Sequence, residues 1–246
     1  MCEIYTDVTG VFPADPSIVP TAKMWGEISY EEAIEMASSG AKVLHPRAAE
    51  VCMAYDVPIH VRSSFENGDG TWIRGVSDMV MEQAAVVGVS SDKKVVKVTL
   101  LNVPDRPGLA AEVFEDLAAE DISVRLIIQS SSSDGLGRIT FVLDELYIQK
   151  AEVLAGRWKS ASLCGDAIIE RDVAKLSIVG SRLASTPGLA SRMFSVLARQ
   201  GINIDCISSS EMKIACVIAE GRLDEAVRVV HDEFFSETKS ASTVAQ

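Results

Sequence analysis

The sequence predicts an α+β protein, an α/β sandwich in which one βαββαβ unit occurs twice after a shorter α/β segment. The main observation is an internal repeat, because the segment from Val96 to Ser130 occurs again from Ala174 to Ser210. From Pro107 to Ser130, 10 of 24 positions are identical to the residue 80 positions later, where chance would give about one or two. In both copies, apolar residues switch between strand and helix spacing in the same order. A duplicated module is therefore the basis of the fold.

Residues 1–75, ahead of the repeats, predict a small α/β segment. Prolines interrupt the first twenty residues, and apolar residues at helical spacing then predict a helix that ends at Gly40. A second helix is expected over Arg47–Tyr55, followed by a strand at residues 59–64. The sequence ENGDG, residues 66–70, is typical of a turn.

Each copy of the repeat predicts a strand, a loop containing Pro-Gly, a helix and a second strand. In the first copy, a strand at Arg138–Leu143, a helix at Tyr147–Trp158 and a strand at Ala167–Asp172 complete the βαββαβ order. The second copy continues with a strand at Met212–Ala219 and a helix at Leu223–Phe235, after which the ending is polar. The second copy therefore lacks a clear last strand.

A strand for that position is available elsewhere in the chain. Residues 84–89 are apolar and precede the first copy without belonging to it. A sheet without its edge strand leaves backbone groups unpaired, so this strand is expected to join the second copy and interlock the two modules. The alternative is that each copy folds alone and residues 84–89 are a linker strand. The predicted domains are residues 1–75, 76–173 (with that strand donated onward) and 174–246.

Composition limits the classes of partner. The chain has 246 residues, 48% of them hydrophobic, so sizeable cores are expected. A formal net charge of −12 argues against nucleic acid and anionic membranes as partners. The five cysteines are scattered, without Cys-x2-Cys spacing, which is typical of reduced thiols. With no apolar run long enough for a membrane span and no signal-peptide pattern, a cytoplasmic protein is expected.

The Pro-Gly loop of the first copy has chemistry that suits a free amino acid. Asp105 and Arg106 precede Pro107, which is expected at the first helical position. Backbone N–H groups and the helix dipole suit a carboxylate, while Asp105 can accept a hydrogen bond from an ammonium group. The dipole contributes about 0.3–1 kcal/mol, against about 4–8 kcal/mol for millimolar to micromolar binding. Further walls are needed, and Gln129 and Ser130 on the next strand are the nearest polar residues.

The second copy has Ser185-Thr186-Pro187-Gly188 at the same place, without a carboxylate, so a weaker or different site is expected there. The simpler alternative for both loops is that Asp105 and Thr186 only cap their helices. Elsewhere, the histidines at 45, 60 and 231 lie far apart in the sequence, so no metal site is expected. No residue spacing nominates a catalytic group.

Three groups of motifs, in order, resemble the aspartate kinase family. The loop DRPG, the strand ISVRLIIQS and the second-copy segment INIDCISSSE resemble its paired ACT regulatory domains. Residues 1–75, with CEIYTDVTGVFPADPSIVP, ISYEEAIEMASSGAKVLHPRA and VPIHVRSSF, resemble the end of its amino-acid-kinase domain. The resemblance covers nearly the whole chain and implies ferredoxin-like ACT modules after a partial kinase domain.

The family's activity is the ATP-dependent phosphorylation of L-aspartate to 4-phospho-L-aspartate, with feedback inhibition by end-product amino acids. The resemblance implies a regulatory, beta-type subunit or a fragment of the enzyme, with lysine, threonine or both as effector. It also implies a homodimer through the ACT modules and a possible full-length catalytic partner subunit. The implied effector-binding residues, of which the last two approach from another copy, are Asp105, Pro107, Gly108, Leu109, Ala110, Gln129, Asn203 and Ile204.

The same resemblance places four residues around the nucleotide, namely Tyr5, Thr6, Asp7 and Lys42. Two departures from the family's motifs remove charges there. Thr9 replaces the second aspartate of the family's T-D-V-D-G, and Ser17 replaces the basic residue of its D-P-R or D-P-K. The family's glycine-containing motif, catalytic lysine and aspartate-binding residues have no counterpart in the sequence. Phosphoryl transfer needs positioned cations, so activity of the chain alone and tight cofactor binding are not expected, and ATP would bind only a complete kinase domain.

Two alternatives stay open beside amino-acid sensing. The ACT pair could dimerise and stabilise a catalytic partner without binding any metabolite. The chain could instead phosphorylate aspartate by itself, which an assay without a partner would reveal.

Overall fold

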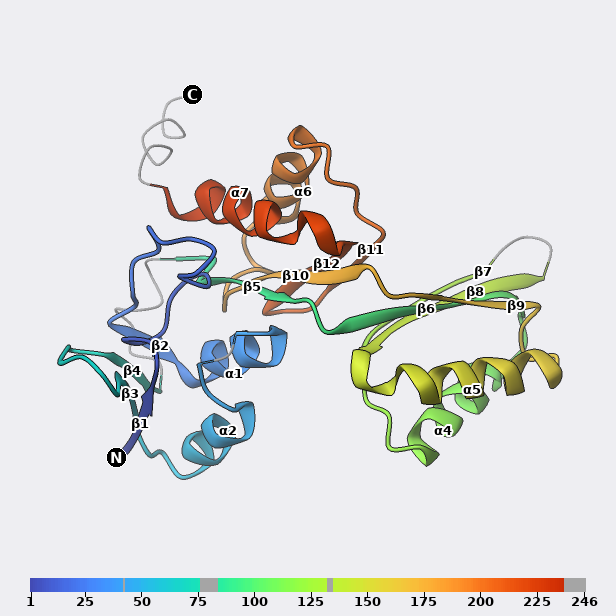
Figure 1. Cartoon of the computed structure of the whole chain (residues 1–246), viewed down its shortest axis with the longest axis horizontal. Coiled ribbons are helices and arrows are strands. Elements are labelled where there is room, and N and C mark those ends of the chain that lie inside the picture. The colour runs from blue at the N-terminus through green and yellow to red at the C-terminus, as the bar shows by residue number, and fades with distance from the viewer. Residues whose placement is uncertain (42, 76–83, 132–134, 237–246) are drawn as a thin grey trace. The chain divides into compact units, whose positions relative to one another are not determined.

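The computed structural model describes residues 1–41, 43–75, 84–131 and 135–236 (Figure 1). The chain divides into two compact units. The larger unit comprises Met1–Asp92, Leu176–Cys216 and Arg222–Gln246, and the smaller unit comprises Lys93–Lys175 and Val217–Gly221. The larger unit thus combines the N-terminal segment with most of the second repeat. The division into residues 1–75, 76–173 and 174–246 stays a prediction about modules.

The first repeat forms a four-stranded sheet in the order β7-β8-β6-β9. Its strands are β6 (Val95–Pro104), β7 (Val124–Ser131), β8 (Leu136–Asp144) and β9 (Asp166–Glu170). The three pairings are antiparallel, so the strands of the βαββαβ unit lie in the order 2-3-1-4. That arrangement confirms the ferredoxin-like fold class for this module.

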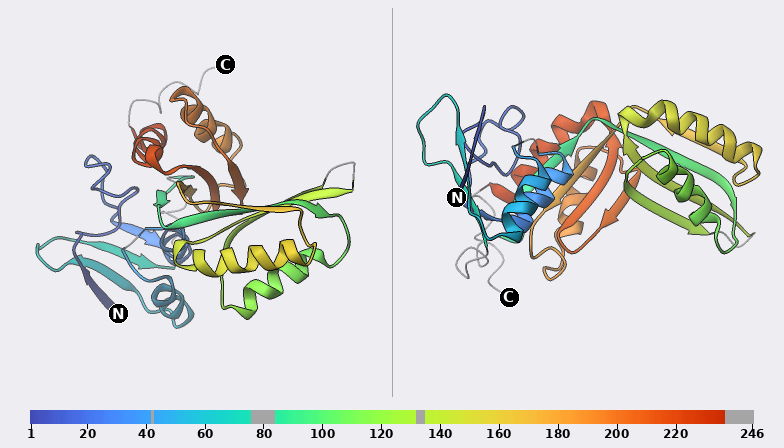
Figure 2. Two further views of the ribbon diagram at one scale, coloured as in Figure 1. Left: turned by 45° about the vertical axis from the view of Figure 1, so that its right-hand side comes forward. Right: turned by 90° about the horizontal axis from the view of Figure 1, so that it is seen from below.

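Two helices, α4 (Leu109–Ala119) and α5 (Ile148–Ser160), cover one face of this sheet (Figures 1 and 2). A short 3-10 turn, Glu145–Tyr147, precedes α5. Apolar side chains from sheet and helices form one buried core, including Leu100, Phe141, Val113, Leu154 and Trp158. The indole N–H of Trp158 donates to Asp116 Oδ2 at 2.8 Å, so its polar atom is satisfied where the ring is buried.

The second repeat forms a sheet in the order β11-β12-β10-β5. Three strands come from the repeat itself, β10 (Val173–Val179), β11 (Cys206–Ser209) and β12 (Lys213–Ala219), while β5 is Gly88–Asp92. The fourth strand therefore precedes the first repeat in the sequence and takes the edge position that β9 has in the first module. The alternative in which this stretch is only a linker is wrong. The strand begins at Gly88, later than the expected residues 84–89.

The helices of the second repeat are α6 (Leu189–Arg199) and α7 (Leu223–Phe235), with a 3-10 turn at Glu220–Arg222 before α7. Helix α7 contacts β5 on one side and helix α1 contacts it on the other (Figure 1). The close approach to the chain before β5 explains one glycine. A Cβ at Gly180 would overlap the backbone of Ala85, so only glycine fits there.

The N-terminal segment has its own sheet, in the order β1-β3-β4-β2. The strands are β1 (Cys2–Thr6), β2 (Glu27–Ser29), β3 (Ile59–Ser63) and β4 (Thr71–Arg74), and the helices are α1 (Tyr30–Ser39) and α2 (Pro46–Ala54). Strand β1 pairs with β3 in parallel, whereas β3 and β4 are antiparallel. Gly40 ends α1, as the sequence predicted. Both predicted helices and the predicted strand at residue 59 are therefore present.

Candidate functional site

The Pro-Gly loop of the first repeat lies between β6 and α4, at the end of the sheet where β7 turns into β8. The backbone N–H of Asp105 donates to Gly135 O at 2.9 Å, which attaches the loop to that turn. Gly108 has a φ of 90° and is the N-cap of α4. Pro107 therefore precedes the helix instead of occupying its first position, which corrects the sequence prediction. The left-handed turn at Gly108 is the physical reason, because the helix can begin only after it.

Within the described residues, no side chain caps the first turn of α4 or of α6. Gly188, with a φ of 89°, is the N-cap of α6 in the same way as Gly108 is for α4. Capping by Asp105 and Thr186, the simpler explanation of the two loops, is therefore wrong. Each loop instead presents the start of a helix whose amides have no carboxylate or hydroxyl cap of their own.

Charges surround the start of α4. The guanidinium of Arg106 donates to both carboxylate oxygens of Glu112, at 2.6 and 2.9 Å. This hydrogen-bonded pair lowers the pKa of Glu112 and raises the pKa of Arg106. The carboxylate of Asp105 is exposed beside the pair. A ligand at this loop would therefore meet one exposed carboxylate, one neutralised cation and the positive end of a helix.

The remaining first-copy residues lie as follows. The side chain of Leu109 is only 2% exposed and belongs to the core, so it can offer a ligand its backbone alone. Ala110 is partly buried on the first turn of α4, and Gln129 is exposed on β7 opposite Ile139. The loop and the end of β7 thus share one end of the sheet. The side chain of Gln129 borders this end as a polar group.

The second-copy residues Asn203 and Ile204 lie just before β11, in the larger unit. Asn203 is exposed and its side-chain amide donates to Asp205 Oδ1 at 3.2 Å, while Ile204 is partly buried. The first-copy residues lie in the smaller unit. Their approach to Asn203 and Ile204 of another copy stays a prediction.

The edge strands β7 and β11 have the same pattern of exposed and buried residues. Residues 121–130 and 201–210 alternate between buried and exposed positions in the same sequence. Ile127 is 53% exposed on β7 and Ile207 is 46% exposed on β11. Large apolar side chains on an edge strand are typical of a surface that pairs with another chain.

The residues expected near a nucleotide lie at the end of β1. Tyr5 is 54% exposed, and the guanidinium carbon of Arg62 lies 5.9 Å from the centre of its ring. The hydroxyl of Thr6 donates to Asp7 Oδ1 at 3.0 Å, and Thr6 lies opposite Ser63 of β3. Tyr5, Thr6 and Asp7 therefore lie together, whereas Lys42 lies outside the described residues.

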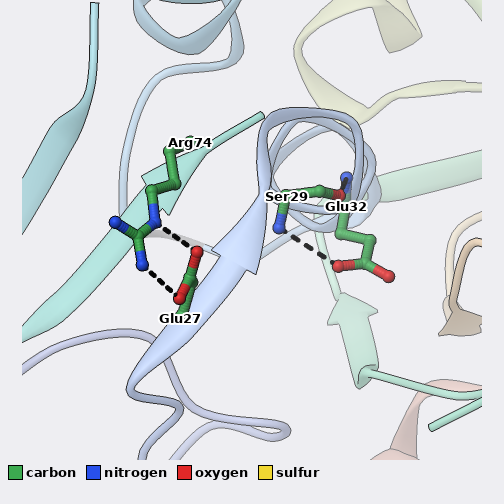
Figure 3. A network of polar contacts seen from close by, with 4 residues as sticks. All are labelled: Glu27, Ser29, Glu32 and Arg74. Atoms are coloured by element: carbon green, nitrogen blue, oxygen red, sulfur yellow. Dashed lines mark hydrogen bonds and ion pairs between the residues drawn. The ribbon is translucent and has the colours of Figure 1, made fainter. Parts of the chain in front are cut away.

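A polar junction that the sequence did not reveal joins α1 to the second repeat. The backbone N–H of Ser29 donates to Glu32 Oε2 at 3.2 Å, a capping-box contact at the start of α1 (Figure 3). Figure 3 also shows the guanidinium of Arg74, on β4, donating two hydrogen bonds to the carboxylate of Glu27 on the neighbouring strand β2. The other oxygen of Glu32 accepts a hydrogen bond from the hydroxyl of Ser181 at 2.9 Å. Ser181 lies in the loop between β10 and α6, so Glu32 links this loop to α1.

One turn further along α1, the ammonium of Lys213 donates to Glu35 Oε1 at 2.5 Å. We call Glu32, Glu35, Ser181 and Lys213 the α1 junction. The Ser-x-x-Glu pattern at Ser29 signals the helix start, but its partner 149 residues away has no local signal. The junction connects the N-terminal segment to the second repeat through both its first loop and strand β12.

A depression with a volume of about 700 Å³ lies on the helical layer of the smaller unit. Asp116, Val153, Gly156 and Arg157 are among its lining residues. It is on α4 and α5, and none of the predicted effector residues lines it. Across residues 1–41, 43–75, 84–131 and 135–236, no group of three His, Cys, Asp or Glu residues could hold a metal ion. The same ranges include no helix long and apolar enough to cross a membrane.

Comparison with known families gives three matches along the chain. Residues 1–63 match the amino acid kinase family, and residues 97–157 and 176–234 each match an ACT domain. The two ACT matches coincide with the two repeats, and the first match coincides with the N-terminal segment.

Known proteins with similar sequences and structures agree with these matches. An aspartokinase from Mycolicibacterium smegmatis is 40% identical over 237 residues, which are 95% of this chain and 56% of that protein. The regulatory subunit of aspartate kinase from Thermus thermophilus is 36% identical, with a TM-score of 0.58, and the match covers 61% of this chain and 99% of that one. Aspartokinase III from E. coli, solved with aspartate and ADP, is 28% identical with a TM-score of 0.81, over 95% of this chain and 52% of that one.

Proposed function

This chain belongs to the aspartate kinase family, and on that premise we propose that its ACT modules bind lysine, threonine or both and mediate feedback inhibition. The chain spans about half the length of the curated relatives that it matches, 56% in the case of the Mycolicibacterium protein. The phosphorylation of L-aspartate by ATP is therefore proposed for the complete enzyme that this chain regulates. In this proposal the enzyme works in the cytoplasm.

The observation that carries the proposal is the Pro-Gly loop of the first repeat. An uncapped helix start attracts the carboxylate of a free amino acid, and the exposed carboxylate of Asp105 attracts its ammonium group. Arg106 is engaged by Glu112, which keeps its charge from competing for Asp105. A zwitterion with both groups on one carbon fits this pair of opposite charges.

The dipole of one helix and one ion pair are too weak for micromolar binding at an exposed surface, so the site needs a second wall. The proposal supplies it by a homodimer through the ACT modules, in which Asn203 and Ile204 of another copy approach Asp105, Gly108 and Gln129. The exposed isoleucines of β7 and β11 support this pairing. A site shared between copies couples effector binding to assembly.

Inhibition then follows from differential affinity. An effector that binds the paired ACT modules better than the unpaired ones shifts the population towards the paired form. The α1 junction offers a path to the kinase segment, because Ser181 and Lys213 contact α1 directly. The strand that leads to Tyr5, Thr6 and Asp7 belongs to the same segment. ATP would bind there, together with Lys42, only when a complete kinase domain is present, either in a longer chain or in a full-length partner subunit.

Isothermal calorimetry with lysine and with threonine tests the proposal. Asp105→Ala removes the contact to the ammonium group, worth about 1.5–3 kcal/mol for a charged hydrogen bond, and should weaken binding roughly 10- to 100-fold. Ser185→Ala, at the equivalent position of the second repeat, is the matched control and should bind as the wild type does. Equal affinities of the wild type and Asp105→Ala would remove Asp105 from the site.

A second function is favoured by the apolar edge strands alone. The ACT pair could dimerise and stabilise a catalytic partner without any effector. Light scattering that shows a dimer, together with no calorimetric signal from any of the twenty amino acids, would support this function over sensing. Activity in a hydroxamate assay without a partner would instead make the chain an active kinase.

A further inference from the structure

Asn67 and Gly68 lie in the loop that joins β3 to β4 (Figure 1). Residues 64–69 are all exposed and lie outside helices and strands. Asparagine is a chemically labile residue, and in a surface loop the backbone nitrogen that follows it can reach its side-chain amide. The loop therefore combines exposure with a reactive dipeptide.

The residue after each asparagine distinguishes Asn67 from the others. The chain has three asparagines, Asn67, Asn102 and Asn203, and all three are exposed. A valine follows Asn102 and an isoleucine follows Asn203, and these β-branched side chains crowd the nitrogen that would have to attack. Gly68 has no side chain, and a Cβ added there would meet no atom within 4 Å. Among the three, Asn67 alone is followed by an unhindered backbone nitrogen.

The contacts of the loop leave the two reacting groups available. The guanidinium of Arg62 donates to Gly68 O at 3.5 Å, and Nε2 of His60 donates to Asp69 O at 2.7 Å. Both contacts come from β3 and hold carbonyl oxygens. Neither the side chain of Asn67 nor the N–H of Gly68 has a hydrogen-bond partner among the described residues. The nucleophilic nitrogen and the amide that it attacks are thus not engaged elsewhere.

Both ends of the loop are fixed by hydrogen bonds. The hydroxyl of Ser63 accepts from two backbone N–H groups that follow it, at 3.1 and 3.3 Å. Thr71 is fully buried, and its hydroxyl accepts from the N–H of Val11 at 2.8 Å and donates to Trp25 O at 2.6 Å. A change at residue 67 therefore alters the loop while its two ends stay in place.

We propose that Asn67 is a modification site, at which the chain converts the asparagine into aspartate and isoaspartate through a cyclic imide. In the first step, the backbone nitrogen of Gly68 loses its proton and attacks Cγ of Asn67, a C–N bond forms, and the side-chain amide leaves as ammonia. In the second step, water opens the ring. Opening at Cγ gives aspartate, whereas opening at the main-chain carbonyl gives isoaspartate. Overall, one water molecule is consumed and one ammonia is released, without oxidation or reduction.

Either product changes the loop. A new carboxylate forms between Glu66 and Asp69 and near the guanidinium of Arg62, which contacts Gly68 O. Isoaspartate also leads the main chain through the former side chain, which adds a methylene group to the loop. It makes residue 67 a substrate for enzymes that methylate isoaspartyl carboxylates. The inference concerns the N-terminal segment and does not depend on amino-acid binding by the ACT modules.

Peptide mapping of the full chain tests the inference. The protein is incubated at physiological temperature and mildly alkaline pH, and trypsin then releases residues 63–74, in which Asn67 has the only side-chain amide. Mass spectrometry should find this peptide heavier by about one mass unit, because OH replaces NH₂. The peptides 98–125 and 200–213, which contain Asn102 and Asn203, should keep their asparagines over the same time.

A methyl-transfer assay and one variant identify the route. An isoaspartyl methyltransferase with labelled S-adenosylmethionine should label the incubated wild type, because a cyclic imide opens to isoaspartate as well as aspartate. Gly68→Val gives Asn67 the same following residue that Asn102 has, at an exposed position with room for a side chain. The variant should lose the methylation, and its Asn67 should convert no faster than Asn102 does.

A synthetic peptide of residues 63–74 measures the conversion without the fold. The proposal is overturned if the folded chain keeps Asn67 intact over the time in which half of the synthetic peptide converts, or if Gly68→Val converts as fast as the wild type. A mass shift without methylation would mean direct hydrolysis of the amide and would overturn it as well. The wild-type comparison decides the matter even if Gly68→Val fails to fold.

Discussion

In the first repeat the Pro-Gly loop is braced by its own helix, whereas in the second repeat the corresponding loop is held by the N-terminal segment. Arg106 reaches forward to Glu112 of α4, while Ser181 reaches Glu32 of α1. Yet Gly108 and Gly188 have φ values of 90° and 89°, so the turn itself is the same. The difference teaches that one module can present its loop to solvent while its duplicate uses the loop for attachment.

The edges of the two sheets differ in the same sense. The first repeat completes its sheet with its own β9, and the second completes it with β5 from before the first repeat. A strand that belongs to a distant part of the sequence makes the second sheet depend on the whole chain. The first module is therefore the self-contained copy, and the second is the copy built into its surroundings.

The largest effect expected from this comparison is a core truncation in the self-contained copy. Leu154 is 1% exposed in the core of the smaller unit, so Leu154→Ala should cost about 2–5 kcal/mol. Hydrogen exchange followed by mass spectrometry should show faster exchange in β8 and little change in α6, which lies wholly in the larger unit. Val153→Ala, at a position 66% exposed, is the control and should change neither. Equal acceleration in β8 and α6 would mean that the two units unfold as one.

A smaller effect is expected where the second copy receives its foreign strand. Gly180→Ala places a methyl group against the backbone of Ala85, which cannot move away as a side chain would, and should destabilise the larger unit by about 1–3 kcal/mol. Gly156→Ala is the matched control, because a Cβ there meets no atom and alanine favours a helix. Chemical denaturation of both variants measures the difference. A neutral Gly180→Ala would show that β5 is not held tightly.

The sequence was most informative where structure depends on local patterns. The repeat predicted the order of strands and helices in both modules, and α7 has the predicted ends, Leu223 and Phe235. The strand predicted at residues 84–89 starts too early in the sequence, because the prediction relied on the apolar side chains of Val86 and Val87. Strand pairing uses main-chain groups, so β5 extends instead through polar Ser90 and Ser91.

The candidate site could be predicted only in part, for the same reason. A Pro-Gly pair signals a helix start, but the sequence alone did not show that Gly108 turns left-handed and places Pro107 outside the helix. The α1 junction depends on Glu32 meeting a serine far along the chain, and no periodicity encodes such a contact. Local chemistry was therefore predictable, while partners across the fold were not.

The third effect concerns the attachment of the second loop. Glu32 is 5% exposed and accepts hydrogen bonds from Ser29 and Ser181, so Ser181→Ala should cost about 0.5–1.5 kcal/mol for the lost bond. Hydrogen exchange should then rise at the start of α6 and of α1. Ser185→Ala is the control. Ser185 lies in the same loop, and among the described contacts its hydroxyl bonds only to the nearby Arg182 carbonyl. Unchanged hydrogen exchange in α1 after Ser181→Ala would mean that this hydrogen bond does not couple the loop to the N-terminal segment.

The smallest effect is the pH response of the charge pair that only the first repeat has, since Thr186 and Arg192 stand at the corresponding positions of the second. The hydrogen bond from Arg106 lowers the pKa of Glu112 below its ordinary value. A lowered folded-state pKa means that the pair contributes stability above the unfolded pKa and loses it as the pH falls through the folded pKa. Because both side chains are exposed, the change in stability should be slight.

NMR titration of the Glu112 carboxyl should give a pKa below that of free glutamate, and Arg106→Gln should raise it. An unchanged titration in that variant would show that Arg106 does not brace the loop in solution, and the two loops would then differ only in the attachment of the second.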